Sequence, residues 1–314
     1  MLQNLTCVST ALLCVVSALA IPANGQRKTR EPVYRVAKNS SKKASATEES
    51  KQPIKATPTS AVKSAAKSTA AKAPHPLDPA LETARAGLAR IRSDVRDYTG
   101  LFVKRERVNG KLLNTEFMKF KIRNERVVDG KKVPFSVYMR FLKPRDFRGR
   151  ECIWVKGENG GKIIAHDNPS KITGRLTVRL DPDGSFAMKG NRYPIYEAGI
   201  ENLVVKLIEK ASRDRAAGDC IVNYSDTAKI NKRPCKMIEL IHPEKREPYE
   251  FYKAKVYIDK ELDLPVRYVS WDWPATKGGK PRLLEEYTYV NLKVNVGLTD
   301  KDFDYKNADY DYRK

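Results

Sequence analysis

The sequence has few residues of the types that carry catalysis or bind metals. Its 314 residues contain five cysteines and three histidines. His75, His166 and His242 have no partner at a metal-ligand or catalytic-triad spacing, so we expect isolated surface histidines. Motifs of the form G-x-S-x-G, phosphate-binding loops and C-x-x-C are absent. We therefore predict a protein that is not an enzyme and that holds no metal and no cofactor.

One pair of carboxylates keeps an enzymatic alternative open. Glu285 and Glu286 lie next to each other in a stretch with strand character. Adjacent residues of a strand point to opposite faces of the sheet, so the pair is poorly placed to act as acid and base on one substrate. A general acid–base site at this point is the less favoured interpretation.

The cysteine count also argues against a disulfide framework. Removal of an N-terminal signal leaves Cys152, Cys220 and Cys235, an odd number. A chain reversal near Asn231-Lys232 places Cys220 and Cys235 tens of ångströms apart at about 3.4 Å per residue, too far for a disulfide bond. We expect all three to be small, buried apolar residues.

Positive charge is in excess, with 60 Lys and Arg against 38 Asp and Glu, a net charge of +22. Such a chain favours anionic partners, which include nucleic acid, anionic lipid and acidic cell-wall polymers. The Gly-aromatic signature of RNA-binding motifs is missing, and we predict no nucleic-acid partner.

The N-terminal segment predicts export. No charged side chain occurs in the first 26 residues, an apolar run extends from Val8 to Ala20, and Ala18-Leu19-Ala20 offers a cleavage site. We interpret residues 1–25 as a signal peptide of a periplasmic or cell-envelope protein. No Lys or Arg precedes the apolar run, whereas Arg27 and Lys28 follow it directly. An uncleaved membrane anchor therefore remains an alternative.

Residues 26–76 have the composition of a disordered linker. They are rich in Lys, Ala, Ser, Thr and Pro, with twelve basic and three acidic residues between positions 27 and 77. Such a tether either touches an anionic membrane or cell-wall surface or serves as a plain spacer.

Residues 77–314 have the pattern of a single α+β domain. A helix is predicted from Asp78 and Pro79, with apolar residues through Val95 at spacings of three and four. A second helix follows Ile200, and Gly218 suits its end. Alternating apolar and polar residues elsewhere, with turns at Asn109-Gly110, Asn159-Gly160 and positions 181–184, predict about ten antiparallel strands.

The C-terminal stretch "TDKDFDYKNADYD" has partial likeness to a calcium loop. Asp300, Asp302 and Asp304 occupy alternate positions, but Tyr305 stands where the sharp turn needs Gly and Asp311 replaces the bidentate Glu. We expect a capped turn at Thr299 followed by a last strand. Its aromatic residues would pack on the domain, and these are Phe303, Tyr305, Tyr310 and Tyr312.

Several segments together resemble a known family. They are "YTGLFVKRERVNGKL", "PFSVYMRFLKP", "GRECIWVKGENGGKIIAH", "DLPVRYVSWDWP" and "LLEEYTYVNLKVNVGLTDKDFDYKNADYDY". This pattern resembles a family of secreted bacterial proteins known as domain-of-unknown-function family 1571. More distantly, the strand order and the Tyr98-x-Gly100-x-Phe102 opening are similar to the lipoprotein-carrier superfamily of LolA, LolB and RseB. That resemblance implies a curved antiparallel half-barrel, with helices over an apolar cavity that receives acyl chains.

We therefore predict an exported protein whose half-barrel holds an acyl lipid or a lipidated protein. Two amphipathic helices are too few to fill so long an apolar sheet face, which leaves room for a ligand. The three tryptophans are either plain core or part of the cavity wall. The predicted wall residues are Phe102, Met118, Phe120, Phe135, Val137, Met139, Phe141 and Trp154.

A second hypothesis needs no cavity. In it the domain is fully packed, and the basic linker makes the chain a cell-envelope module for an anionic polymer or a partner protein. Salt-sensitive binding that is lost with residues 27–76 would distinguish this module from a carrier.

Overall fold

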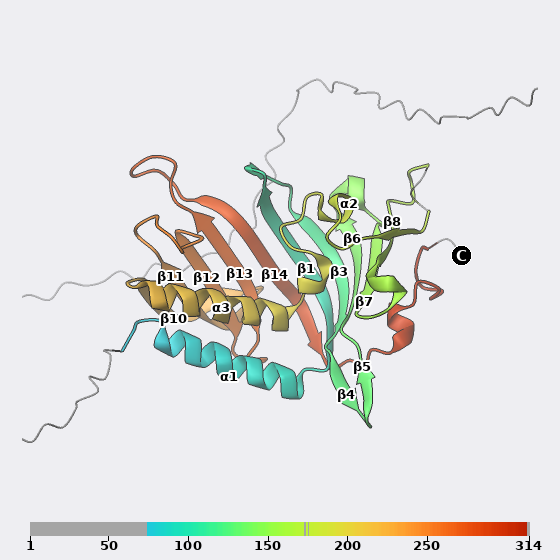
Figure 1. Cartoon of the computed structure of the whole chain (residues 1–314), viewed down its shortest axis with the longest axis horizontal. Coiled ribbons are helices and arrows are strands. Elements are labelled where there is room, and N and C mark those ends of the chain that lie inside the picture. Colours follow the sequence, from blue (N-terminus) through green and yellow to red (C-terminus); the bar gives the residue numbers. More distant parts are fainter. Residues whose placement is uncertain (1–73, 173, 175, 313–314) are drawn as a thin grey trace, which may run out of the picture. The chain divides into compact units, whose positions relative to one another are not determined.

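The computed structural model describes residues 74–172, 174 and 176–312 (Figure 1). The predicted signal peptide and nearly all of the predicted linker lie outside the described residues. Every described residue belongs to the compact unit Ala46–Lys314. No helix in the described part of the chain is long and apolar enough to cross a membrane.

An open antiparallel sheet of twelve strands forms the body of this unit. Its spatial order is β10 (Ile221–Ile230), β11 (Arg233–Ile241), β12 (Lys253–Asp259), β13 (Pro265–Asp272), β14 (Arg282–Val294), β1 (Asp97–Val108), β3 (Glu116–Arg123), β6 (Ser136–Lys143), β7 (Glu151–Val155), β8 (Ile163–His166) and β9 (Val178–Leu180), with β2 (Lys111–Leu112) paired to β1. A separate hairpin joins β4 (Arg126–Val128) and β5 (Lys131–Val133). The predicted α+β class is confirmed. The expected ten strands were too few, because strands of two or three residues are too short to show alternation.

The sheet consists of two meanders that meet in its middle. The first begins at β1 and proceeds to the edge strand β9, and the second begins at the opposite edge, β10, and returns to β14 beside β1. Between them the chain must cross the sheet. This crossover contains α2 (Ser185–Met188), the 3-10 turn η3 (Ile195–Glu197) and α3 (Ile200–Ala217).

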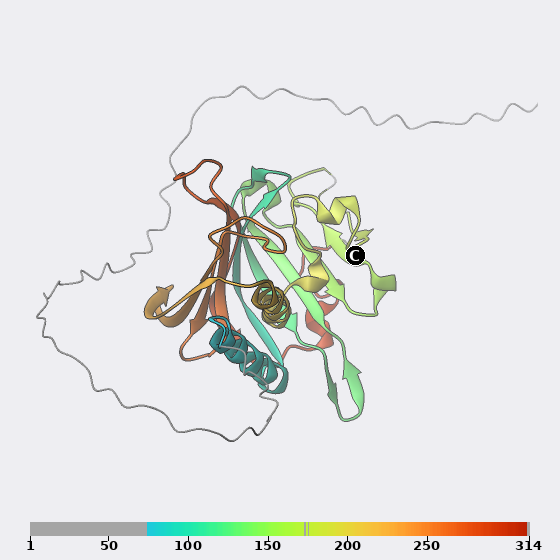
Figure 2. The same cartoon turned by 60° about the vertical axis from the view of Figure 1, so that its left-hand side comes forward.

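The two long helices lie on one face of the sheet, and the sheet bends around them (Figures 1 and 2). They are α1 (Asp78–Asp94) and α3, and they pack against each other and the sheet. Both were predicted from their apolar spacing, and Gly218 ends α3 with a φ of 123°. The predicted turns at Asn109-Gly110 and Asn159-Gly160 also form, with positive φ at all four residues.

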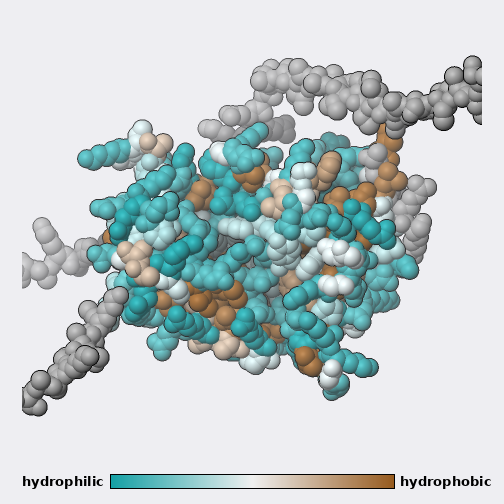
Figure 3. All heavy atoms as spheres, in the orientation of Figure 1, coloured by the Kyte–Doolittle hydropathy of each residue, from teal (hydrophilic) through white to brown (hydrophobic). Residues whose placement is uncertain are grey.

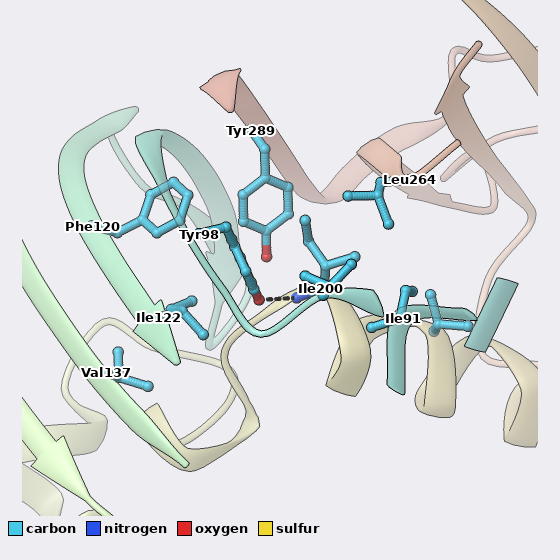
Figure 4. Packing of buried hydrophobic residues seen from close by; sticks show 10 residues of the cluster. Ile91, Tyr98, Phe120, Ile122, Val137, Ile200, Leu264 and Tyr289 are labelled. Carbon is cyan, nitrogen blue, oxygen red and sulfur yellow. Dashed lines mark hydrogen bonds between the residues drawn. The ribbon is translucent and has the colours of Figure 1, made fainter. Parts of the chain in front are cut away.

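The main core lies where α1 and α3 meet the middle strands (Figure 4). Ile91 of α1 and Ile200 of α3 pack against Phe120, Ile122 and Val137, and all five side chains are almost fully buried. At about 25 cal/mol per Å² of apolar area, burial of this kind is the largest favourable term in folding.

One hydrogen bond fixes the start of α3 within this core. The hydroxyl of Tyr98, which is fully buried, accepts the backbone N–H of Ile200 at 2.7 Å. The preceding residue must be glycine, because Gly199 has a φ of 104° and a Cβ there would lie 2.8 Å from the Tyr98 hydroxyl. The hydrogen bond from Ile200 to Tyr98 therefore fixes both where α3 lies and the residue at which it begins.

The opposite, convex face is partly covered by the end of the chain. Phe303 of η4 (Asp300–Phe303), Tyr310 and Tyr312 pack on Tyr138 and Ile164. The predicted capping of Thr299 is confirmed by a capping box with Asp302. The predicted last strand was wrong. The chain instead turns twice, because the side chains at positions 304 and 307 accept backbone N–H groups two residues further on.

We expect Tyr98→Phe to lower the free energy of unfolding by about 1–3 kcal/mol, because the buried N–H of Ile200 loses its acceptor. Urea titration measures the change. Tyr305→Phe is the matched control, since within the described residues no hydrogen bond involves its hydroxyl. Equal stability of the two variants would show that the bond to Ile200 contributes nothing.

Candidate functional site

A cavity of about 580 Å³ lies between the concave face of the sheet and the crossover. The sheet contributes residues of eight neighbouring strands from β13 to β9, and the crossover contributes residues between Pro182 and Lys210. The apolar part of the lining includes Phe102, Met118, Met139, Phe141, Ile163, Ala165, Leu180, Phe186, Ile195, Leu203, Leu207 and Tyr289.

Strand register aligns this apolar wall in rows. Tyr289, Phe102, Met118 and Phe141 are successive cross-strand neighbours on β14, β1, β3 and β6. The rings of Phe102 and Tyr289 are stacked with centroids 5.0 Å apart. Cross-strand neighbours share a face of the sheet, so one residue known to face the cavity shows that its neighbours in the row face the cavity too.

Four of the eight predicted wall residues line the cavity, namely Phe102, Met118, Met139 and Phe141. The other four lie on the same face of the sheet but are covered by protein. Phe120 and Val137 belong to the core beneath α1 and α3. Phe135 and Trp154 pack against each other, with ring centroids 6.1 Å apart, beside Tyr196 of η3. A role for any of the eight in ligand binding stays a prediction.

Sequence reasoning missed two parts of the wall. The tyrosines of β13 and β14, Tyr268, Tyr287 and Tyr289, face the cavity, and their alternation with outward residues in "EEYTYV" was an available signal. The crossover residues carry no comparable signal, because Ile195 and Phe186 lie in segments too short for a period to show.

Five polar residues form a connected cluster at one end of the cavity. Glu106 of β1 and Glu285 of β14 are direct cross-strand neighbours, and each is nearly fully buried. The hydroxyl of Tyr287 lies 2.5 Å from Glu106 Oε1 and 3.1 Å from Glu285 Oε2. Lys104, two residues before Glu106 on β1, forms an ion pair with Glu106, and Arg192 of the crossover forms an ion pair with Glu285.

This cluster ties the crossover to the sheet. Arg192 donates its backbone N–H to Glu106, its Nε to Glu285 and one terminal nitrogen to the carbonyl of Arg107. Lys104 donates to the amide oxygen of Asn191. Burial opposes a charge on Lys104, but Glu106 and its second partner, Glu116, outweigh burial and raise its pKa. These ion pairs and hydrogen bonds hold the crossover against the sheet. Glu106 and Glu285 therefore already have hydrogen-bond donors within the protein.

The predicted facing of the adjacent glutamates is correct. Glu285 points into the cavity toward Arg192, whereas Glu286 points to the convex face, where Arg267 NH1 lies 2.7 Å from its Oε1. They do not form an acid–base pair.

The cysteine thiol at the cavity is held in an unreactive form. Cys152 lines the cavity, and burial raises the pKa of its thiol to about 12, so the nucleophilic thiolate is not populated at neutral pH. Cys152, Cys220 and Cys235 are all unpaired, as predicted. Within the described residues, no three His, Cys, Asp or Glu side chains are grouped to hold a metal ion.

The expectation of surface histidines was wrong for two of the three. His166 and His242 are buried to 1% and 0% exposure. Each lies beside a buried carboxylate, with His166 Nε2 3.6 Å from Glu151 Oε2 and His242 Nε2 3.4 Å from Asp214 Oδ2. Glu151 and His166 are cross-strand neighbours in the hairpin of β7 and β8, whereas Asp214 and His242 are 28 positions apart and no local motif indicates their contact.

We predict that the second pair shares a proton when the Asp214 carboxyl is protonated. His242 Nδ1 faces the carbonyl oxygen of Phe251 at 3.0 Å, which can only accept, so this nitrogen carries a hydrogen. The lone pair of Nε2 then faces the Asp214 carboxyl. Burial raises the pKa of Asp214 to about 6 and lowers that of His242, and both shifts favour a neutral pair in which Asp214 donates to Nε2.

The contribution of Asp214 to stability should therefore fall as the pH rises from about 4 to 6, because its folded pKa of about 6 lies above its ordinary value of 3.8. This contribution is complete below pH 3.8 and is lost as the pH rises through about 6. We expect Asp214→Asn, whose amide donates to Nε2 at every pH, to be the more stable protein at pH 7 and to show a flatter profile. Thermal unfolding from pH 4 to 8 measures both.

Burial opposes a charge on His166, but Glu151 and two backbone carbonyls outweigh burial and raise its pKa above 6.5, so its contribution to stability is lost only above the pH window of Asp214. The His166 contribution is the same in wild type and in Asp214→Asn, so the difference between their pH profiles reports on Asp214. An identical slope for wild type and Asp214→Asn would exclude the shared proton.

Comparison with known proteins fixes the family. A family model described as Protein of unknown function (DUF1571) matches residues 95–312. The chain belongs to this family. The match covers the sheet, the crossover and the C-terminal segment, in agreement with the predicted resemblance.

Solved structures of similar fold show low sequence identity. Lipoprotein LppX from Mycobacterium tuberculosis is 13% identical over 71% of this chain and 98% of its own, with a TM-score of 0.38. A DUF1329 family protein from Desulfovibrio piger is 15% identical over 74% and 98%, with a TM-score of 0.36. A putative outer membrane lipoprotein-sorting protein domain from Vibrio parahaemolyticus is 17% identical over 71% and 95%, with a TM-score of 0.33.

Likeness at this level carries no inference about the ligand of the DUF1571 chain. None of the curated proteins matches the chain. The chain's own cavity is therefore the basis for proposing its function.

Proposed function

We propose that this DUF1571 protein is an exported, non-enzymatic carrier or sensor that holds an acyl chain of a lipid or of a lipidated protein. The observation that supports this most directly is the cavity of about 580 Å³ between the sheet and the crossover. Ligand cavities usually measure about 300–1,000 Å³ and are lined mainly by apolar and aromatic side chains.

The distribution of polar groups in the wall favours a hydrocarbon chain over a polar small molecule. The row of Tyr289, Phe102, Met118 and Phe141 is apolar, and the two buried glutamates of the wall, Glu106 and Glu285, lie side by side. There Glu106 and Glu285 already accept hydrogen bonds from Tyr287 and Arg192. A polar ligand would have to displace these bonds, whereas a hydrocarbon chain needs no hydrogen-bond partner.

Affinity for single-chain fatty acids should rise with chain length until the cavity is full. Each buried CH₂ contributes about 0.8 kcal/mol, or roughly a fourfold lower Kd. Isothermal titration of C8, C10, C12, C14 and C16 acids against the full chain tests this. A Kd independent of length would show that the carboxylate head, and not the cavity, provides the binding.

Filling the cavity should remove binding without unfolding the protein. Met139 lines the cavity on β6 and is only partly buried, so we expect Met139→Trp to raise the Kd for a C16 acid at least tenfold. Met237→Trp is the matched control, since Met237 is a partly buried strand residue that lines neither this cavity nor the one beside α1. Equal losses in the two variants would count against the assigned wall.

Native mass spectrometry of the protein exported to a bacterial periplasm would identify the ligand class. We expect a co-purifying mass that organic extraction removes and that behaves as an acyl lipid. An unliganded mass that takes up neither fatty acid nor phospholipid would overturn the proposal. Recovery of the full precursor mass would show instead that residues 1–25 are retained.

A further inference from the structure

A second apolar cavity, of about 400 Å³, lies on the other side of α3 from the first. Its walls are α1, α3 and the concave face of β11, β12 and β13. Figure 3 shows hydrophobic atoms gathered in the gap between α1 and α3. The sheet side of this cavity includes Ile238, Leu240, Ala254 and Val256.

The two cavities adjoin at α3. Leu207 and Lys210, one helical turn apart, line both of them. The Lys210 amine lies 2.9 Å from a carboxylate oxygen of Glu250, and the Lys210 side chain is 19% exposed. The aliphatic stem of Lys210 therefore separates the two cavities, while its charged amine faces outward. The partition between the cavities is thus a few side chains of one helix.

The residues of α1 that face this cavity are unusually small for a helix that packs on a sheet. Gly87 lies in the middle of α1, where glycine costs about 0.5–1 kcal/mol relative to alanine. The fold does not require it, because Gly87 has no positive φ and a Cβ there would meet no atom within 4 Å. Gly87 and Ala84 leave space that a larger side chain would fill.

The dimensions suit an extended hydrocarbon chain. The lining residues of α1 extend from Leu77 to Ile91, about 21 Å at 1.5 Å per residue. One leaflet of a bilayer is about 15 Å of hydrocarbon, half of the ~30 Å core. Asp214, the buried carboxyl in this wall, lies beside His242, with its Oδ2 3.4 Å from His242 Nε2.

We propose that the second cavity holds a second acyl chain of the same ligand. The ligand is then a lipid, or a lipid-modified polypeptide, with at least two acyl chains that lie on either side of α3. This inference rests on the proposed function and narrows its ligand class. One molecule of a single-chain lipid would fill only one of the two cavities, so two such molecules would be needed to fill both.

Gly87→Phe tests the inference, because it fills the second cavity from α1 and leaves the first unchanged. By native mass spectrometry, we expect the full-length wild type to bind two molecules of palmitic acid and Gly87→Phe to bind one. The affinity for dipalmitoyl phosphatidylglycerol should fall about tenfold or more. Gly87→Ala, the matched control, improves the helix without filling the cavity and should bind as wild type does.

The outcomes separate this inference from the proposed function. One bound palmitate in wild type, with unchanged phospholipid affinity in Gly87→Phe, would overturn the second site and leave the first intact. No uptake of either lipid by wild type would overturn the proposed function itself. Ala254→Phe approaches the same cavity from β12, so agreement between the two variants excludes an effect of misfolding in α1.

Discussion

The concave side of this protein depends on the contact between the Tyr98 hydroxyl and the first N–H of α3. The chain has to cross from one sheet edge to the other between β9 and β10, and a crossover of this length has many paths open to it. Tyr98 fixes the point where it becomes a helix, and Gly199 provides the close approach that this requires. The position of α3 in turn determines the shape of both cavities, since its side chains line each of them.

A second set of contacts holds the earlier half of the crossover by electrostatics instead of packing. Arg192 reaches Glu106 and Glu285 on two neighbouring strands, and removal of the arginine would take the cationic partner from the buried Glu285. The crossover is thus fixed by the hydrogen bond to Tyr98 at the start of α3 and by the contacts of Arg192 nearer to β9. Between these two points lie Ile195 and Ala198, which line the cavity.

The sequence allowed the sheet and both long helices to be predicted, and half of the eight predicted wall residues line the cavity, because these features depend on local periodicity. Phe102, Met118, Met139 and Phe141 alternate with polar residues, and alternation determines which face a residue takes. Periodicity does not tell how deep a residue lies beneath a helix, and Phe120 and Val137 were therefore placed in the wall although α3 covers them. The buried histidines could not be found, since Asp214 meets His242 only when α3 packs against the loop after β11.

The arrangement of the two meanders also determines when the domain can fold. β1 is the first strand of the sheet, yet its central neighbour is β14, so that Tyr98 pairs with Val294 almost two hundred residues later. Contacts this distant in sequence form slowly, because the chain must close a long loop before it gains any pairing. A chain synthesised from its N-terminus consequently lacks the middle of its sheet until β14 has been made. The topology therefore makes completion of the sheet depend on the last strand of the chain.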